Sequence, residues 1–161
     1  MDSMIKEFES ISSAVKKLAG ENVRIERKIP VHGGDINDAW KLYLSDGSRL
    51  FMKSNSIENF DFFRKEINGL ALLKRTACIG VPEIYGIGRN HEENCSFLMM
   101  EFLESPYRCE NYWRKFGMEL AEVHNAPFET AQILGNENAK FGFYEDNYIG
   151  AGRQKNSPAA S

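Results

Sequence analysis

The sequence predicts an α+β fold in which a five-stranded antiparallel sheet is accompanied by helices. Five segments between residues 23 and 103 either alternate apolar and polar side chains or run continuously apolar, and glycine-containing turns separate the first three. Three further segments repeat their apolar residues at helical spacing. With 161 residues, 42% of them apolar, the chain has room for one packed domain, or for a small domain and part of a second.

The first element is expected to be an amphipathic helix that covers one side of the sheet. Gly20 would end it. Its apolar positions recur at three- and four-residue steps: Ile5, Phe8, Ile11, Val15 and Leu18.

Three strands joined by two turns are expected next. Residues 23–31 form the first, where Pro30 indicates an edge or a strand end, and residues 39–44 and 49–53 form the second and third. A glycine turn at 33–37 and an Asp-Gly turn at 45–48 connect them, so the three strands are predicted to be consecutive and antiparallel.

A second helix is predicted over residues 59–75, because Phe63, Ile67 and Leu70 share one helical face and Glu66 lies at its edge. The proline that follows at position 82 interrupts the helical pattern. Residues 84–88 then predict a short fourth strand, and residues 96–102 a buried fifth strand.

A third amphipathic helix is expected around Trp113, Phe116, Leu120 and Val123, ending near Pro127. Residues 128–161 show no clear period, and the tail over 152–161 is expected to be disordered.

Composition and charge exclude several kinds of partner. A net charge of −3 without a basic face gives no electrostatic case for nucleic acid or acidic membranes. Cys78, Cys95 and Cys109 form neither a paired disulfide framework nor a CxxC metal knuckle, so a reducing, cytoplasmic setting is expected. Residues 1–20 contain charged residues throughout, and we expect no signal peptide and no membrane span.

Lys53 and Glu66 are the most informative candidate site residues. Lys53 ends the third predicted strand, and Glu66 follows thirteen residues later in the second helix. A strand lysine held by a helix glutamate is the arrangement with which kinases grip the α- and β-phosphates of ATP. The alternatives are a surface lysine at a strand end and a solvated helix glutamate.

Other candidate residues would contact the phosphates or the adenine of a bound nucleotide. Gly33 and Gly34 would let backbone N–H groups approach phosphates, although a glycine pair in a hairpin is more often only a turn. Asn37 is expected to cap this turn, with a phosphate contact as the alternative. Glu101 and Leu103, where the fifth strand runs into a loop, would offer backbone carbonyl and N–H groups to adenine.

Taken together, these segments resemble the fructosamine kinase family. The segment Phe141–Gly150 is similar to that family's F-G-F-x-x-D-N-Y-I-G sequence, which separates it from aminoglycoside and choline kinases of the same fold. The other motifs that carry the resemblance run in chain order: Gly33–Asn37, Phe51–Asn55, Phe63-x-x-Glu66-x-x-Gly69-Leu70, Val81–Glu83, Phe97–Leu103 and Leu120-Ala121-x-x-His124.

The resemblance implies a protein-kinase-like N-terminal lobe over residues 1–103, with an αC-type helix bearing Glu66. Residues 104–151 would be the hinge and the first helix of a truncated C-terminal lobe. The implied activity is ATP- and Mg²⁺-dependent phosphorylation of the sugar O3′ of ketosamines, such as fructosamines or ribulosamines on glycated amines and proteins. Phosphorylation destabilises the adduct and releases the amine, which makes the pathway a deglycation.

By the same resemblance, Gly33 and Gly34 would cover the phosphates, Lys53 would bind them, and Glu66 would orient Lys53. Glu101 and Leu103 would hold adenine. Three further residues are expected to be structural, His124 as a hydrogen-bonding residue and Asp146 and Asn147 as turn formers rather than metal ligands.

The sequence departs from the family pattern in two ways. Asp35 stands where some relatives carry a cysteine linked to redox control, so that switch is not expected here. The family's H-G-D-x-x-x-x-N catalytic segment and its later metal-binding aspartate do not occur in these residues. We therefore expect no catalytic or metal-binding residue in this chain, and no activity from it alone.

Two functional hypotheses follow. The chain is either the amino-terminal, nucleotide-binding part of a ketosamine kinase, or a truncated, non-catalytic module that binds a nucleotide or a partner. In both cases we expect self-association through apolar surface at the lobe interface.

Overall fold

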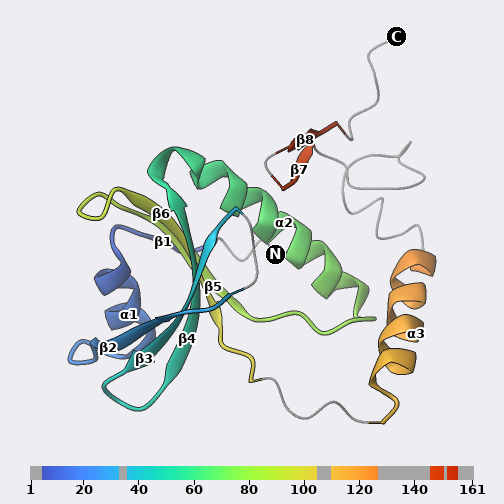
Figure 1. Ribbon diagram of the computed structural model, residues 1–161, viewed down its shortest axis with the longest axis horizontal. Helices are drawn as coiled ribbons and strands as arrows, with labels where there is room; N and C mark the ends of the chain where they lie inside the picture. The colour runs from blue at the N-terminus through green and yellow to red at the C-terminus, as the bar shows by residue number, and fades with distance from the viewer. Residues whose placement is uncertain (1–4, 33–35, 105–109, 127–145, 151, 156–161) are drawn as a thin grey trace. The chain divides into compact units, whose positions relative to one another are not determined.

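The computed structural model describes residues 5–32, 36–104, 110–126, 146–150 and 152–155 (Figure 1). The chain divides into two compact units. Unit 1 comprises Met1–Arg64 and Pro82–Glu104, and unit 2 comprises Lys65–Val81 and Ser105–Ser161.

Unit 1 is built on a six-stranded sheet with the order β1-β5-β6-β4-β3-β2. The neighbouring pairs among β2 to β6 are antiparallel, whereas β1 runs parallel to β5. The α+β class and the five expected antiparallel strands are therefore confirmed. The strands are β1 (Glu7–Phe8), β2 (Ile25–Pro30), β3 (Asp38–Leu44), β4 (Arg49–Ser56), β5 (Ile84–Asn90) and β6 (Cys95–Glu101).

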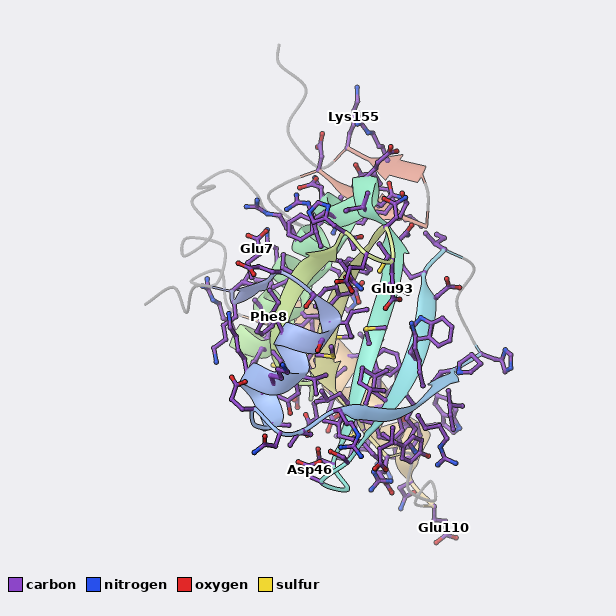
Figure 2. All side chains as sticks on the ribbon, turned by 90° about the vertical axis from the view of Figure 1, so that its left-hand side faces the viewer. Glu7, Phe8, Asp46, Glu93, Glu110 and Lys155 are labelled. Atoms are coloured by element: carbon purple, nitrogen blue, oxygen red, sulfur yellow. The ribbon has the colours of Figure 1, made fainter. Side chains whose placement is uncertain are left out.

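The start of the first helix was wrongly predicted. Helix α1 spans Ile11–Ala19, and Ser10 caps it by accepting a hydrogen bond at its Oγ from the Ser13 N–H, 3.0 Å away. Because the cap residue has an extended backbone, the chain before it leaves the helix and forms β1. Phe8, which lies beside α1 (Figure 2), pairs with Gly88 of β5 and is almost fully buried.

The main core lies between α1 and one face of the sheet. Helix α1 contributes Ala14 and Val15, which are almost fully enclosed. The buried residues of this core come from β1, α1, β3, β4 and β6: Phe8, Ile11, Ala14, Val15, Leu42, Leu44, Leu50, Met52, Phe97 and Met99. As predicted, the first helix covers one side of the sheet.

A second helix begins in unit 1 and continues into unit 2. A 3₁₀ turn, η1 (Ile57–Asn59), leads into α2 (Phe60–Thr76), whose bounds lie within one residue of the prediction. Phe60, Phe63 and Ile67 are buried at helical spacing, as an amphipathic helix requires. Arg89 of β5 stacks on the Phe60 ring, with its guanidinium carbon 3.5 Å from the ring centroid.

Unit 2 also contains α3 (Tyr112–Asn125) and a two-stranded sheet of β7 (Asn147–Ile149) and β8 (Gly152–Gln154). The strands are antiparallel, and Asn147 lies opposite Gln154. The structure thus differs from the expectation of a disordered tail from residue 152, since that segment begins as a strand. Residues 156–161 of the expected tail lie outside the described residues.

None of the helices in the described part of the chain is long and apolar enough to cross a membrane.

Candidate functional site

Lys53 lies inside the central strand β4 rather than at its end. The strand continues for three residues beyond it, to Ser56, which corrects the predicted end at residue 53. Lys53 is opposite Ala39 of β3 on one side and Leu98 of β6 on the other. Two neighbouring strands therefore fix the backbone that carries this ammonium group.

Alternation along β4 decides which face of the sheet carries Lys53. Leu50 and Met52 belong to the core under α1, and side chains on a strand alternate between its faces. Phe51, Lys53 and Asn55 therefore lie on the face opposite α1. Lys53 is only partly exposed there.

Glu66 lies in the part of α2 that belongs to unit 2, whereas Lys53 belongs to unit 1. Glu66 is partly buried, and neither residue is without a partner. The placement of Glu66 on a helix is as predicted, and its pairing with Lys53 stays a prediction.

The glycine turn is described only from its C-terminal side. Gly33, Gly34 and Asp35 lie outside the described residues, so their predicted phosphate contacts stay predictions. Asn37 is described, and its Oδ1 accepts a hydrogen bond at 2.6 Å from Nδ2 of Asn55. This contact gives Asn37 a partner on β4, whereas the expected turn cap and the alternative phosphate contact both stay predictions.

The two predicted adenine contacts lie where β6 ends. The N–H of Glu101 donates to the Glu83 carbonyl at 2.9 Å, and the Glu101 carboxylate Oε2 accepts from the Glu83 N–H at 3.1 Å. Leu103 follows two residues beyond the strand, with 58% of its surface exposed. Glu101 is thus held on both sides, by Glu83 and by its ladder partner Leu50, while Leu103 lies beyond the ladder.

A group of cations and aromatic rings lies on the same face of the sheet as Lys53, and the sequence analysis missed it. Lys41 of β3 pairs with Phe51 of β4. Its Nζ is 4.1 Å from the ring centroid of Phe102 and 4.8 Å from the ring centroid of Tyr43. A hydrogen bond with Lys41 lowers the pKa of Tyr43 below its ordinary value. The alternation Ala39, Lys41, Tyr43 was the signal that could have shown this group.

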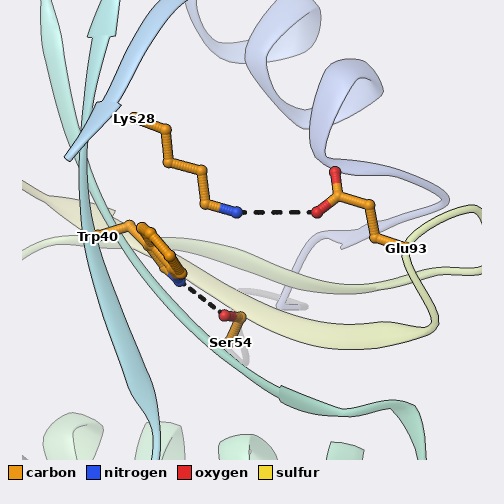
Figure 3. Close-up of polar contacts among 4 residues, drawn as sticks. All are labelled: Lys28, Trp40, Ser54 and Glu93. Atoms are coloured by element: carbon orange, nitrogen blue, oxygen red, sulfur yellow. Dashed lines mark hydrogen bonds and ion pairs between the residues drawn. The ribbon is translucent and has the colours of Figure 1, made fainter. Parts of the chain in front are cut away.

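The opposite face carries a different polar group near its edge (Figure 3). Trp40 Nε1 donates to Ser54 Oγ at 2.8 Å, and Lys28 Nζ lies 4.2 Å from the Trp40 ring centroid and 3.7 Å from a Glu93 carboxylate oxygen. Ser54 is buried, so this bond satisfies a hydroxyl that is shielded from water.

The described residues contain no cluster of three or more His, Cys, Asp or Glu side chains that could hold a metal ion. His124 is exposed on α3. The Asp146 carbonyl accepts a hydrogen bond from Lys65 Nζ, and the Asn147 Oδ1 accepts one from the Tyr148 N–H. The first contact joins residues that are 81 positions apart in the chain and the second joins neighbours, and both lie within unit 2.

Sequence comparison identifies the family of the chain. Residues 7–161 match the sequence profile of fructosamine kinases. The chain belongs to the fructosamine kinase family. Among its relatives, a probable ketoamine kinase of Vibrio vulnificus is 32% identical over 152 residues, 93% of this chain. A chloroplastic protein-ribulosamine 3-kinase of rice, Oryza sativa subsp. japonica, is 32% identical over 139 residues, 86% of this chain.

Solved structures agree with this family fold. The crystal structure of a putative fructosamine-3-kinase from Haemophilus somnus is 29% identical, covers 92% of this chain and has a TM-score of 0.70. A second, from Thermobifida fusca, is 23% identical with a TM-score of 0.61 and supports the fold. The chain spans about half the length of these relatives, 48% of the Vibrio protein and 46% of the Haemophilus chain.

Proposed function

We propose that these 161 residues supply the nucleotide-binding part of an ATP-dependent ketosamine kinase. The observation that carries the proposal is the family match over residues 7–161. The lysine on the central strand is the group in this fold that suits a polyphosphate.

The strand β4 supports a specific orientation of the nucleotide. Glu101 is opposite Leu50 at one end of β4, and Asn55, bonded to Asn37, lies near the other. At about 3.4 Å per residue the two ends are roughly 17 Å apart, comparable to the length of an extended nucleoside triphosphate. Adenine would lie at the Glu101 and Leu103 end, and the phosphates at the Lys53 and Asn37 end.

Lys53 fits the phosphate end because its ammonium is cationic and lies on a partly shielded face, where a charge pair is stronger than in bulk water. Glu66 would keep that ammonium charged and oriented. Leu103 fits the adenine end because its backbone lies beyond the strand ladder.

The described residues suit Mg²⁺ less well than they suit the nucleotide. The described residues hold no cluster suited to a metal, and no H-G-D-x-x-x-x-N segment occurs in the sequence. Bound Mg²⁺ would neutralise part of the phosphate charge of ATP, and none of the described residues is assigned to hold it, so the role proposed for this chain is to hold the nucleotide.

The proposed reaction of the complete kinase transfers the γ-phosphoryl group of ATP to the sugar O3′ of a ketosamine, yielding ADP and a phosphorylated adduct. The rice relative, by its name a ribulosamine 3-kinase, supports ribulosamines as one substrate class. Deglycation would follow, because phosphorylation makes the adduct less stable and releases the amine.

Calorimetric titration of the chain with ATP and Mg²⁺ tests the nucleotide part. We expect saturable binding that Lys53→Met weakens by about tenfold or more, since a charged hydrogen bond is worth about 1.5–3 kcal/mol. Lys16→Met, at an exposed position of α1, is the matched control and should bind as the wild type does. Absence of ATP binding by the folded wild type would refute the proposal.

A second candidate is a non-catalytic, partner-binding module. It is favoured by α3, on which Tyr112, Trp113, Phe116, Met118 and Leu120 are all exposed. ATP binding discriminates between the two candidates, because a module that only binds a partner needs no nucleotide.

A further inference from the structure

The side chain of Asn55 connects three segments of unit 1. Its Nδ2 donates to the Ile36 carbonyl at 3.2 Å and to Asn37 Oδ1 at 2.6 Å. Its Oδ1 accepts from the Ser56 N–H at 2.7 Å and from Asn59 Nδ2 at 3.0 Å. The carboxamide therefore uses both donors and both acceptor positions, its full capacity.

The orientation of this amide is determined by its partners. A backbone carbonyl, that of Ile36, must face the NH₂ group, and a backbone N–H, that of Ser56, must face the oxygen. In the reversed amide, the oxygen would face the Ile36 carbonyl oxygen and the NH₂ group would face the Ser56 N–H, so neither hydrogen bond could form. The network thus requires an asparagine in this orientation.

Backbone pairing alone does not hold the chain next to the glycine turn. The ladder between β3 and β4 ends with Asp38 opposite Ser54, so Ile36 and Asn37 lie outside it. Asn55, one residue beyond Ser54, holds them through its side chain instead. This side chain extends the connection between the two strands past the last ladder pair.

The same side chain reaches the entry of α2. Asn59 is the last residue of η1, immediately before Phe60 begins the helix. Its amide bonds Asn55, which lies two residues after Lys53 on the same face of β4. One carboxamide thus fixes three segments relative to one another: the strand with Lys53, the chain that leaves the glycine turn and the start of the helix with Glu66.

We propose that Asn55 is a positioning residue for the triphosphate: it holds the Ile36–Asn37 segment at a fixed place relative to Lys53. The inference rests on the proposed nucleotide function. Asn55 is not assigned a contact with the nucleotide. Because Asn37 Oδ1 is occupied by Asn55, the remaining amide group of Asn37 is its NH₂, a donor of the kind that a phosphate oxygen accepts.

The test compares ATP with adenosine, which shares the adenine end and lacks phosphates. Asn55→Ala removes all four bonds, and Asn55→Leu removes them while keeping a side chain of similar size and no charge. We expect either variant to lower the affinity for ATP about tenfold while the affinity for adenosine stays within about twofold, given about 1 kcal/mol per hydrogen bond. Asn22→Ala, at an exposed turn, is the matched control.

Each other outcome overturns the inference. Equal losses of affinity for ATP and adenosine would make Asn55 a structural residue only. The same conclusion would follow if neither variant were folded, as shown by the absence of a transition in a thermal melt. Wild-type affinity for ATP in both variants would show that positioning by Asn55 is not needed, with the proposed function intact. If wild-type protein binds neither ligand, the proposed function fails, and this inference with it.

Discussion

Trp40 on β3 and Ser54 on β4 are joined across the sheet by a 2.8 Å hydrogen bond from the indole Nε1 to the serine hydroxyl. Ser54 is only 8% exposed, and on β4 it follows directly after Lys53. The bond lies on the α1 face, so it stabilises the strand from the side opposite the lysine.

Replacing Ser54 with alanine should destabilise the fold without a direct effect on nucleotide binding. The indole N–H would lose its acceptor in a largely enclosed place, and we expect a loss of about 1–3 kcal/mol in the free energy of unfolding. Urea unfolding measures it. In the background of Trp40→Phe, which has no N–H, the same substitution should cost clearly less. Equal costs in the two backgrounds would contradict the bond's role.

The predicted pairing of Lys53 with Glu66 can be tested by a double-mutant cycle on ATP affinity. Glu66→Gln should weaken ATP binding, because the Lys53 ammonium would no longer be oriented toward the phosphates. After Lys53→Met, Glu66→Gln should have little further effect, since two groups that act together are not additive. Additive losses, measured by calorimetry, would show that Glu66 does not act through Lys53.

The Cys95 thiol should titrate at higher pH than an exposed thiol. Burial raises its pKa, Glu93 raises it further, and Lys28 opposes them. The unfolded chain loses this proton first as pH rises, so stability should fall once pH passes the ordinary cysteine pKa and level off above the folded value. Iodoacetamide alkylation between pH 7 and 10, with Cys78 and Cys109 changed to serine, reports the shift. Glu93→Gln should move the alkylation curve to lower pH.

Gly88 should not tolerate a side chain. An added Cβ would lie 2.4 Å from the Phe8 carbonyl oxygen and 2.4 Å from the Phe97 Cζ. Since the backbone of β1 would have to move, Gly88→Ala should cost about 1–3 kcal/mol, as overpacking does. Gly117→Ala, in α3 with no heavy atom within 4 Å of the added Cβ, should instead be neutral or stabilising by up to about 1 kcal/mol. Equal melting temperatures of Gly88→Ala and Gly117→Ala would contradict this prediction.

We expect a second copy of the chain to associate through α3. Trp113 is 64% exposed, and its ring lies 5.1 Å from that of Tyr112 and 6.4 Å from that of Phe116, measured between centroids. Contiguous exposed apolar surface promotes association. Sedimentation velocity should show dimers that weaken in Trp113→Gln and persist in Arg114→Gln. A monomer at high concentration would contradict this expectation.

Most of the sheet could be predicted because its strands carry the period of two and are separated by turns with clear chemistry. The start of α1 could not, since Ile5, Phe8 and Ile11 also fit helical spacing; the competing signal was Ser10, whose side chain caps the helix and excludes the residues before it. Strand β8 was missed because glycine and charged residues, here Gly152 and Arg153, have little strand propensity.

The elements that carry the candidate site residues could be predicted from the sequence, whereas the roles of these residues stay predictions. Lys53 lies on the strand expected for it, because the Asp-Gly turn at 45–48 and the apolar residues that follow it mark that strand. Asn55 received no role, because an asparagine near a strand end is common and its bonds depend on partners far away in sequence. Three asparagines, at positions 37, 55 and 59, converge only after β3, β4 and η1 have come together.

Strand β1 and the opposite edge strand β2 affect how readily the sheet can pair with a foreign strand. Among the described residues β1 pairs with Ile87 and Gly88 of β5, so it blocks that part of the β5 edge. At the other edge, β2 has a shift in register between Ile25 and Arg27, two adjacent cations, and Pro30, which has no N–H to donate. The β2 border of the sheet is therefore a poor template for adding a foreign strand.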